Sequence, residues 1–259
     1  MTRLAITDLD VRFGDRQVVD IDGLAVGEAE IVGLAGESGS GKSMTTLAVL
    51  GLAHTVGATV SGSIKLDGTE LTTMSQREML AVRGRRIAAI FQSPSMAFSP
   101  VFRVGAVVLG ALQLHGMSKG EADEAARAAM RQVLLSPDLL DRYPAHLSGG
   151  QLQRVAIAIA LALRAQVLLA DEPTSALDVT VQAEVLDLIR ELREREGMSV
   201  LFISHDLAVV GELCDRVAIM RGGRIVEQGP AGAVLSAPKD PYTADLLAAV
   251  PQIKAEASQ

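Results

Sequence analysis

The sequence predicts an α/β fold with a mostly parallel sheet, to which an antiparallel β subdomain and an inserted α-helical subdomain are added. Short apolar strands alternate with helices along much of the chain, which is typical of a parallel sheet. Residues 3–34 instead favour consecutive strands, and residues 93–164 favour helices without a convincing strand. The chain has 259 residues, 49% of them hydrophobic, which is enough for one large domain with such an insert.

The N-terminal part of the chain is expected to supply the first strands. Their apolar residues alternate or cluster, and turn signals rich in glycine and aspartate separate them. The expected strands lie within 3–34, at 63–66 and at 86–91. Within the helical stretch, Ser118 and Glu121 form a capping box that predicts the start of a helix reaching about Leu135.

The C-terminal part returns to alternating strands and helices. A helix from about Val179 to Glu196 carries an apolar stripe at helical spacing and is expected to end at Gly197. The expected strands are 167–170, 199–204, 217–220 and 225–227, with a second helix at 207–213. The last two strands are expected to pair as a hairpin. We therefore expect a core with its antiparallel subdomain at 1–92 and 165–235, a helical subdomain at 93–164, and a C-terminal tail at 236–259.

A glycine-rich loop between an expected strand and an expected helix predicts a phosphate-binding site. Residues 36–43 match the pattern G-x-x-x-x-G-K-[ST], after the apolar segment 30–35 and before a helix at 44–52. Glycines let backbone N–H groups approach phosphate oxygens, and the helix N-terminus also favours an anion. Lys42 adds a positive charge and Ser43 a hydroxyl for Mg²⁺. The alternative, a turn that merely links two elements, is disfavoured by the strand–loop–helix context. The expected phosphate contacts are Gly36, Ser38, Gly39, Ser40, Gly41, Lys42, Ser43 and Met44.

Two carboxylates, Asp171 and Glu172, end the apolar strand at 167–170. A carboxylate at a strand tip is where P-loop enzymes hold Mg²⁺, so Asp171 fits that role. Glu172 is then placed to polarise a water molecule that attacks the γ-phosphate. A strand that simply ends in a polar turn is the alternative, and it would be preferred if the phosphate loop were absent.

A second anion site is predicted at Leu147–Gln151. Ser148 is a candidate N-cap, and Gly149 and Gly150 expose backbone N–H groups at the start of an apolar helix. One nucleotide needs only one such site, so the second is explained if it serves a nucleotide bound by another subunit. The alternative is a well-capped helix without a ligand.

Together these segments resemble the ATP-binding subunit of ABC transporters, in the family's order and over essentially the whole chain. Residues 36–43 resemble its Walker A loop, Leu147–Gln151 its signature motif, and Asp171-Glu172 its Walker B pair. Gln92 resembles the Q-loop glutamine, Ser175–Asp178 the D-loop, His205 the switch histidine, and Phe13 the aromatic residue that stacks on adenine. Taken singly, Gln92, His205 and Phe13 would pass for ordinary structural residues.

The resemblance implies a P-loop NTPase fold of the ABC-ATPase type, with a RecA-like core, and roles for these residues with ATP and Mg²⁺. The implied catalytic residues are Glu172, His205, Gln92 and Lys42, and the implied Mg²⁺ ligands are Ser43, Gln92 and Asp171. Ser148, Gly149, Gly150 and Gln151 would bind the γ-phosphate of a nucleotide held by an opposing subunit. Asp178 would line the interface between the two subunits.

Two further segments resemble the oligopeptide, dipeptide and nickel importer branch of this family: Arg86–Pro100 and Ala237–Thr243. This implies a second, different ATPase subunit, two integral membrane permease subunits and an extracytoplasmic substrate-binding protein. It also implies a peripheral location at the cytoplasmic face of the inner membrane. Because Cys214 is the only cysteine, no iron–sulfur cluster is expected. Nickel or metallophore uptake remains the alternative to peptide uptake. For the tail, we favour a docking helix that carries no information about the substrate.

Composition argues against several other classes of protein. A net charge of −7 disfavours a nucleic-acid partner, and one cysteine excludes an internal disulfide and a cysteine-based zinc site. No apolar run approaches the ~18 residues of a membrane span, and the N-terminus lacks a signal-peptide core, so we expect a soluble chain. A soluble ABC ATPase of DNA repair or translation would carry a coiled-coil insert, zinc cysteines or a second cassette, none of which is apparent. A regulatory subunit that does not hydrolyse ATP is disfavoured by intact Glu172, His205 and Ser148.

Overall fold

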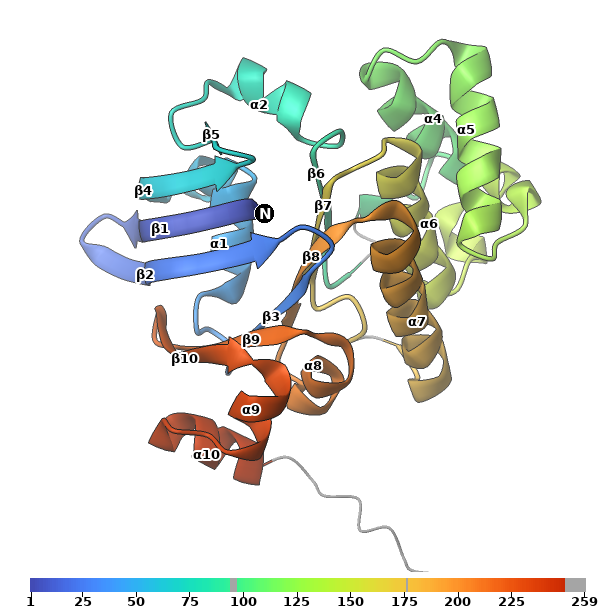
Figure 1. The fold of residues 1–259 in the computed structure, drawn as a ribbon. Coiled ribbons are helices and arrows are strands. Elements are labelled where there is room, and N and C mark those ends of the chain that lie inside the picture. The colour runs from blue at the N-terminus through green and yellow to red at the C-terminus, as the bar shows by residue number, and fades with distance from the viewer. Residues whose placement is uncertain (94–96, 176, 250–259) are drawn as a thin grey trace, which may run out of the picture.

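A computed structural model describes residues 1–93, 97–175 and 177–249 (Figure 1). Residues 94–96 of the segment Arg86–Pro100 and residue 176 of the segment Ser175–Asp178 lie outside the described residues, as does the end of the tail from residue 250 onward. The described chain contains two β-sheets with helices between and beside them, as the sequence predicts.

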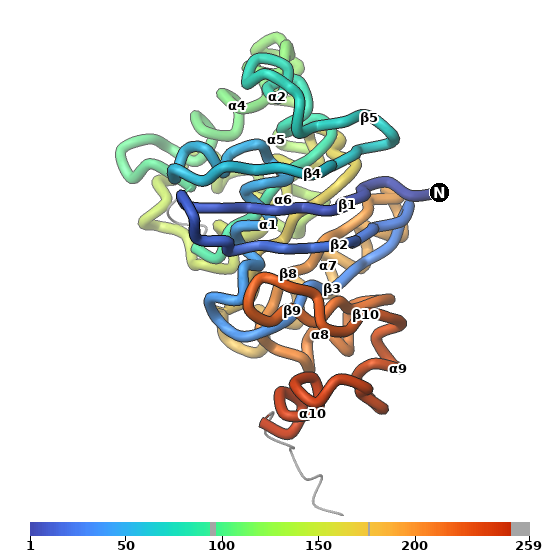
Figure 2. Tube along the Cα trace, turned by 90° about the vertical axis from the view of Figure 1, so that its left-hand side faces the viewer, coloured from blue at the N-terminus to red at the C-terminus, as the bar shows by residue number. Residues whose placement is uncertain are grey.

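The first sheet is antiparallel and has four strands in the order β2-β1-β4-β5. Figure 2 shows β1, β2 and β4 running side by side along one face of the molecule. Buried residues alternate along β1 and β2, so one side of the sheet faces the interior and the other faces solvent. The strands are β1 (Thr2–Phe13), β2 (Arg16–Gly27), β4 (Thr59–Leu66) and β5 (Thr69–Glu70).

The central sheet has six strands in the order β10-β9-β3-β8-β7-β6. All neighbours are parallel except β10, which forms the expected hairpin with β9. The strands are β3 (Ile31–Ala35), β6 (Ile87–Ile90), β7 (Val167–Asp171), β8 (Ser199–Ser204), β9 (Arg216–Arg221) and β10 (Arg224–Pro230). Because β3, β7 and β8 are buried on both faces, their sequences are continuously apolar rather than alternating.

The helices divide between the two faces of the central sheet (Figure 1). Helix α1 packs between the two sheets, and α4 to α8 lie on the opposite face with a second group of apolar side chains. The α-helices are α1 (Lys42–Val49), α2 (Gln76–Val82), α4 (Val104–Leu114), α5 (Lys119–Gln132), α6 (Gly149–Ala162), α7 (Val179–Glu196), α8 (Leu207–Leu213), α9 (Ala231–Ser236) and α10 (Pro241–Ala248). Short 3₁₀ turns occur at Ala53–Val56, Pro137–Asp141 and Pro144–His146.

The structure differs from the sequence prediction at helices α5 and α2. Helix α5 stops at Gln132 rather than near Leu135, because Leu134 adopts a left-handed backbone with φ of 58°. Helix α2 follows Ser75, whose capping box with Glu78 the sequence prediction overlooked. The tail contains α10, which packs against β10 and agrees with the favoured interpretation of this segment as a docking helix. Within the residues described here, no helix is both long and apolar enough to cross a bilayer.

Candidate nucleotide-binding site

The phosphate loop connects β3 to α1 at the carboxyl edge of the central sheet. Glycine is required at Gly36, where a Cβ atom would lie 2.1 Å from the carbonyl oxygen of Met220. The hairpin between β9 and β10 also holds the loop, since the Gly223 N–H donates to the Ser40 carbonyl at 2.9 Å. The loop therefore has a backbone shape that is fixed by neighbouring strands before any ligand arrives.

The N-terminus of α1 offers the features of an anion site. Gly41 at the N-cap has φ of 111°, and no side chain in the described part of the protein caps the first turn or places an acid in it. Unsatisfied N–H groups at a helix start, together with the helix dipole, favour a bound anion. The start of α1 is therefore suited to bind phosphate oxygens.

Lys42 lies beside this helix start with its ammonium directed into the loop. Its Nζ donates to the carbonyl oxygens of Gly36 and Glu37, both at 2.7 Å, and to Ser40 Oγ at 3.4 Å. The side chain is buried, and burial lowers its pKa while the carboxylates of Glu172 and Asp171 oppose that shift. Lys42 is thus a positive charge held by loop carbonyls at the place where phosphates would bind.

Ser43 and Asp171 meet at the carboxyl end of β7. The Ser43 hydroxyl donates to Asp171 Oδ1 at 3.2 Å, and the carboxylate is 5% exposed. Burial raises the pKa of Asp171, and the hydrogen bond from Ser43 opposes that shift. In the described ranges no group of three or more His, Cys, Asp or Glu side chains could hold a metal. Two oxygens suffice for Mg²⁺ bound with phosphates and water, so these residues fit that ion.

Glu172 and His205 form a hydrogen-bonded pair next to this site. Glu172 Oε1 lies 3.0 Å from His205 Nδ1. The Glu172 backbone has φ of 49°, in the left-handed region, and its N–H donates to the Ile203 carbonyl of β8 at 2.9 Å. The order β8-β7 places the ends of these two strands side by side. A carboxylate held by an imidazole beside Lys42 and Asp171 is suited to accept a proton from water.

Gln92 and Phe13 lie at the ends of their strands. Gln92 follows β6, which runs parallel to β7, so it lies at the same sheet edge as Asp171, and it is exposed. Phe13 ends β1, and its ring is 38% exposed and accessible to a ligand. No hydrogen bond joins either side chain to the phosphate loop within the part of the chain that the structure describes.

The second predicted anion site lies at the start of α6 and is occupied by its own capping box. The Ser148 Oγ accepts from the Gln151 N–H at 3.2 Å, and Gln151 Oε1 accepts from the Ser148 N–H at 2.9 Å. Asp178 caps α7 nearby by accepting from Val181 N–H at 3.0 Å. Among the described residues, no hydrogen bond connects Leu147–Gln151 to the phosphate loop. The segment Leu147–Gln151 and Asp178 therefore lie near each other at the starts of α6 and α7. Neither forms a hydrogen bond with the phosphate loop of the same chain in the described residues.

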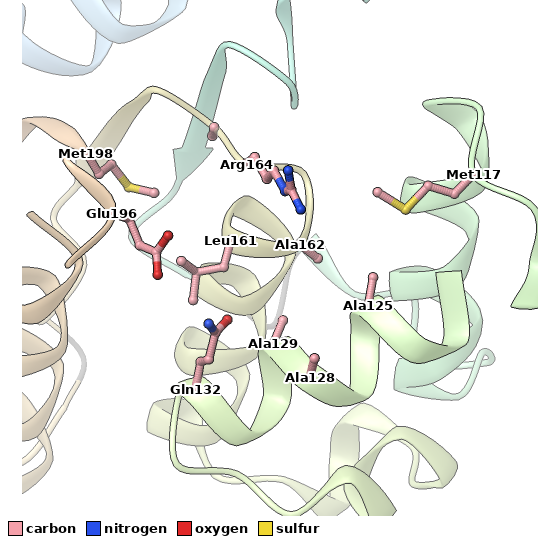
Figure 3. A pocket seen from close by; sticks show the side chains of 11 residues that line it. Met117, Ala125, Ala128, Ala129, Gln132, Leu161, Ala162, Arg164, Glu196 and Met198 are labelled. Carbon is pink, nitrogen blue, oxygen red and sulfur yellow. The ribbon is translucent and has the colours of Figure 1, made fainter. Parts of the chain in front are cut away.

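A cavity of about 600 Å³ lies elsewhere, between α5 and the ends of α6 and α7 (Figure 3). Its lining includes Met117, Ala129, Leu161 and Met198, with Arg164 and Glu196 among the polar members. None of the predicted site residues lines it. The candidate site is instead defined by contacts at the carboxyl edge of the central sheet.

Sequence reasoning missed the contact of the tail with the phosphate loop. The hydroxyl of Tyr242 in the tail accepts a hydrogen bond from the Glu37 N–H at 3.3 Å. The two residues are 205 positions apart, so no local pattern could reveal the contact. The only signal in the sequence is the tail segment Ala237–Thr243, for which the sequence favours a docking helix without indicating what it contacts.

Comparisons with known proteins give consistent matches. The model of the ABC transporter family matches residues 20–175. The dipeptide transport ATP-binding protein DppD of Escherichia coli (strain K12) is 40% identical, over 97% of this chain and 79% of the relative. The probable peptide ABC transporter ATP-binding protein y4tR of Sinorhizobium fredii (strain NBRC 101917 / NGR234) is 45% identical, over 96% and 76% respectively.

Two solved structures match the fold over most of this chain. The structure of cbiO1 from Clostridium perfringens, part of the ABC transporter complex cbiONQ, has a TM-score of 0.80 at 25% identity and covers 91% of each chain. A dimeric, post-hydrolysis structure of the ATP-binding cassette MJ0796 with ADP and Pi has a TM-score of 0.75 at 26% identity, covering 88% of this chain and 98% of that one. These matches confirm the predicted fold class.

Proposed function

Because the chain belongs to the ABC transporter family of ATP-binding proteins, we propose that it is the ATP-hydrolysing subunit that powers uptake of peptides through partner membrane subunits. The observation that carries the ATPase assignment is the cluster of Lys42, Ser43, Asp171, Glu172 and His205 at one sheet edge. The peptide assignment rests on relatives named for peptide transport that align with nearly the whole chain.

The phosphate contacts are proposed from the geometry of the loop, and the roles of Phe13 and Gln92 from the family resemblance. Backbone N–H groups from Gly36 to Met44 and the Lys42 ammonium bind the β- and γ-phosphates, and Phe13 stacks on the adenine. Ser43 and Asp171 would hold Mg²⁺, with Gln92 as a further ligand, and the ion would supply charge neutralisation for the transferring phosphoryl group. The close approach of Ser43 to Asp171 supports this pair as the protein part of the metal site.

Hydrolysis is proposed to use Glu172 and His205 as a unit. Glu172 orients a water molecule and accepts its proton as the water oxygen bonds to the γ-phosphorus and the bond to the β-phosphate oxygen breaks. His205 holds the Glu172 carboxylate in place and contacts the γ-phosphate. Lys42 and the loop N–H groups stabilise the charge on the transferring group.

A second ATPase subunit is proposed to complete each site. Ser148, Gly149, Gly150 and Gln151 of one subunit contact the γ-phosphate on the other, and Asp178 lines the interface. Support comes from the separation of this segment from the loop of its own chain and from the dimeric form of the matched cassette. In this proposal residues 93–164 form the helical subdomain that contacts the permeases, and 236–259 form the tail.

The proposed assembly contains two permease subunits and an extracytoplasmic substrate-binding protein, with this chain peripheral at the cytoplasmic face of the inner membrane. The decisive test is reconstitution with those partners in liposomes, followed by measurement of ATPase stimulation. Peptide-loaded binding protein is expected to raise ATP turnover. Stimulation by a nickel chelate alone, without any response to peptides, would contradict peptide uptake while leaving the ATPase assignment intact.

The catalytic assignment is tested with the Glu172→Gln variant. It is expected to bind ATP, remain as a closed dimer on size-exclusion chromatography and lose nearly all turnover, because the amide cannot accept the proton. The exposed Glu196 offers a matched control, and E196Q is expected to hydrolyse ATP normally. Wild-type turnover by E172Q, or full turnover by a monomer too dilute to dimerise, would overturn the proposal.

A further inference from the structure

The tail segment Ala237–Thr243 is fixed to the central sheet just before it reaches the phosphate loop. It lies beyond residues 20–175, which the family model matches. Glu227 of β10 accepts hydrogen bonds from the N–H groups of Lys239 at 2.9 Å and Asp240 at 3.1 Å. Asp240 then caps α10 by accepting from the Tyr242 N–H at 2.8 Å. Three hydrogen bonds thus set the backbone from which Tyr242 projects.

The Tyr242 side chain is itself held in one place. It is 6% exposed, and the Arg221 guanidinium lies 4.7 Å from the centre of its ring. A cation over an aromatic face is attractive. Arg221 ends strand β9, and the preceding residue, Met220, packs against Gly36 of the phosphate loop. The hydroxyl points at the loop and accepts the Glu37 N–H at 3.3 Å.

The peptide group between Gly36 and Glu37 is therefore held at both ends. Its N–H donates to Tyr242, and its carbonyl oxygen accepts from Lys42 Nζ at 2.7 Å. Hydrogen bonds in such a chain polarise one another, so each strengthens the next. The Lys42 ammonium, which is expected to bind the phosphates, thus donates a hydrogen bond to a peptide group whose orientation depends on the tail.

We propose that Tyr242 is a positioning residue of the nucleotide site, which orders the phosphate loop through the Glu37 N–H. It does not touch the nucleotide. A loop that is ordered in advance binds its ligand at a smaller entropic cost, so losing the hydroxyl weakens nucleotide binding. Among the described residues, Glu172 and His205 make no hydrogen bond to Tyr242 or to this peptide. At saturating ATP the bound phosphates hold the Lys42 ammonium, so the rate at saturating ATP is unchanged. The inference rests on the proposed function.

The first experiment is the Tyr242→Phe variant of the full chain, which keeps the ring and its contact with Arg221. We expect the Kd and the KM for Mg·ATP to rise ~3- to 10-fold, the effect of one lost hydrogen bond, with kcat retained. The chain has two tyrosines, so Tyr143, 39% exposed on the helical insert, gives a matched control. Y143F is expected to keep wild-type Kd and KM.

The second experiment uses tyrosine emission and does not depend on the Y242F protein. The chain has no tryptophan, so Y143F leaves Tyr242 as its only strongly fluorescent residue. We expect a saturable change in emission on adding Mg·ATP, with a midpoint equal to the Kd. The K42A/Y143F protein, given the same additions, corrects for absorption by the nucleotide and is expected to show no saturable change.

The outcomes separate the two proposals. The positioning role is overturned if Y242F keeps the wild-type KM. It is also overturned if emission from Y143F does not change with Mg·ATP while K42A loses ATP binding. Both results leave the assignment of the nucleotide site intact. Normal ATP affinity in K42A instead overturns the nucleotide site itself. A fall in kcat at unchanged KM in Y242F would show a structural defect and would also overturn the inference.

Discussion

Replacing Gly150 with alanine is expected to destabilise the chain, whereas the same change at the neighbouring Gly149 is not. Both residues lie in the first turn of α6. A Cβ atom at Gly150 would lie 2.2 Å from Val181 Cγ1 on α7, while one at Gly149 would lie 3.6 Å from Leu177 Cδ2. Carbon atoms pack best at ~3.5–4.0 Å, so only Gly150 lacks room for a methyl group.

The size of the difference follows from two opposing terms. Overpacking of this kind costs ~1–3 kcal/mol, and Val181 is β-branched within a helix, so it cannot easily rotate away. Exchanging glycine for alanine in a helix gains up to ~1 kcal/mol at either position. Because the helix gain cancels in the comparison, the free energy of unfolding of G150A should lie ~1–3 kcal/mol below that of G149A.

Urea unfolding of the nucleotide-free chain measures this difference, since loss of ATPase activity would not separate packing from phosphate contact. Val181→Ala removes the obstructing methyl group, so it should destabilise the wild type and G149A but recover stability in G150A. Equal unfolding midpoints for G149A and G150A, or a V181A effect that is the same in all backgrounds, would refute the packing argument.

Three other changes have defined outcomes. Burial raises the pKa of Glu70, but hydrogen bonds from neighbouring hydroxyl and N–H groups outweigh it and lower the pKa to about 2. The contribution of Glu70 to stability is full above its usual pKa of 4.5 and is lost as the pH falls toward 2. In E70Q the free energy of unfolding should therefore depend less steeply on pH in that range. Gly33→Ala places a Cβ 2.8 Å from Val210 Cγ1 and should cost ~1–3 kcal/mol in urea unfolding, partly recovered by V210A. Ser43→Ala should raise the Mg²⁺ concentration needed for half-maximal ATPase several-fold without changing the melting temperature greatly.

Element types were largely predictable because periodicity and flanking signals agreed. Strands β3, β7 and β8 are continuous apolar runs, as expected for strands covered on both faces. Helix α2 was missed because it has seven residues and buries only Met79 and Val82, which is too short a pattern to show a helical period. The end of α5 was misplaced because a leucine rarely takes the left-handed conformation that Leu134 adopts.

The candidate site was predictable residue by residue but not as a geometry. The motifs name Ser43, Asp171, Glu172 and His205 separately, each with a role. Their contacts depend on β8 lying between β3 and β7, and sequence order does not state which strands are neighbours. The contact of the tail with the phosphate loop through Tyr242 depends in addition on where α10 packs.

The left-handed backbone of Glu172 carries a trade-off for anyone who engineers this protein. That conformation costs a non-glycine residue ~1 kcal/mol or more, and glycine or asparagine would adopt it with less strain. Libraries selected for thermal stability alone should therefore accumulate Gly or Asn at position 172. Such variants would be more stable but would no longer hydrolyse ATP. Thermotolerant variants are best chosen under a simultaneous demand for catalysis.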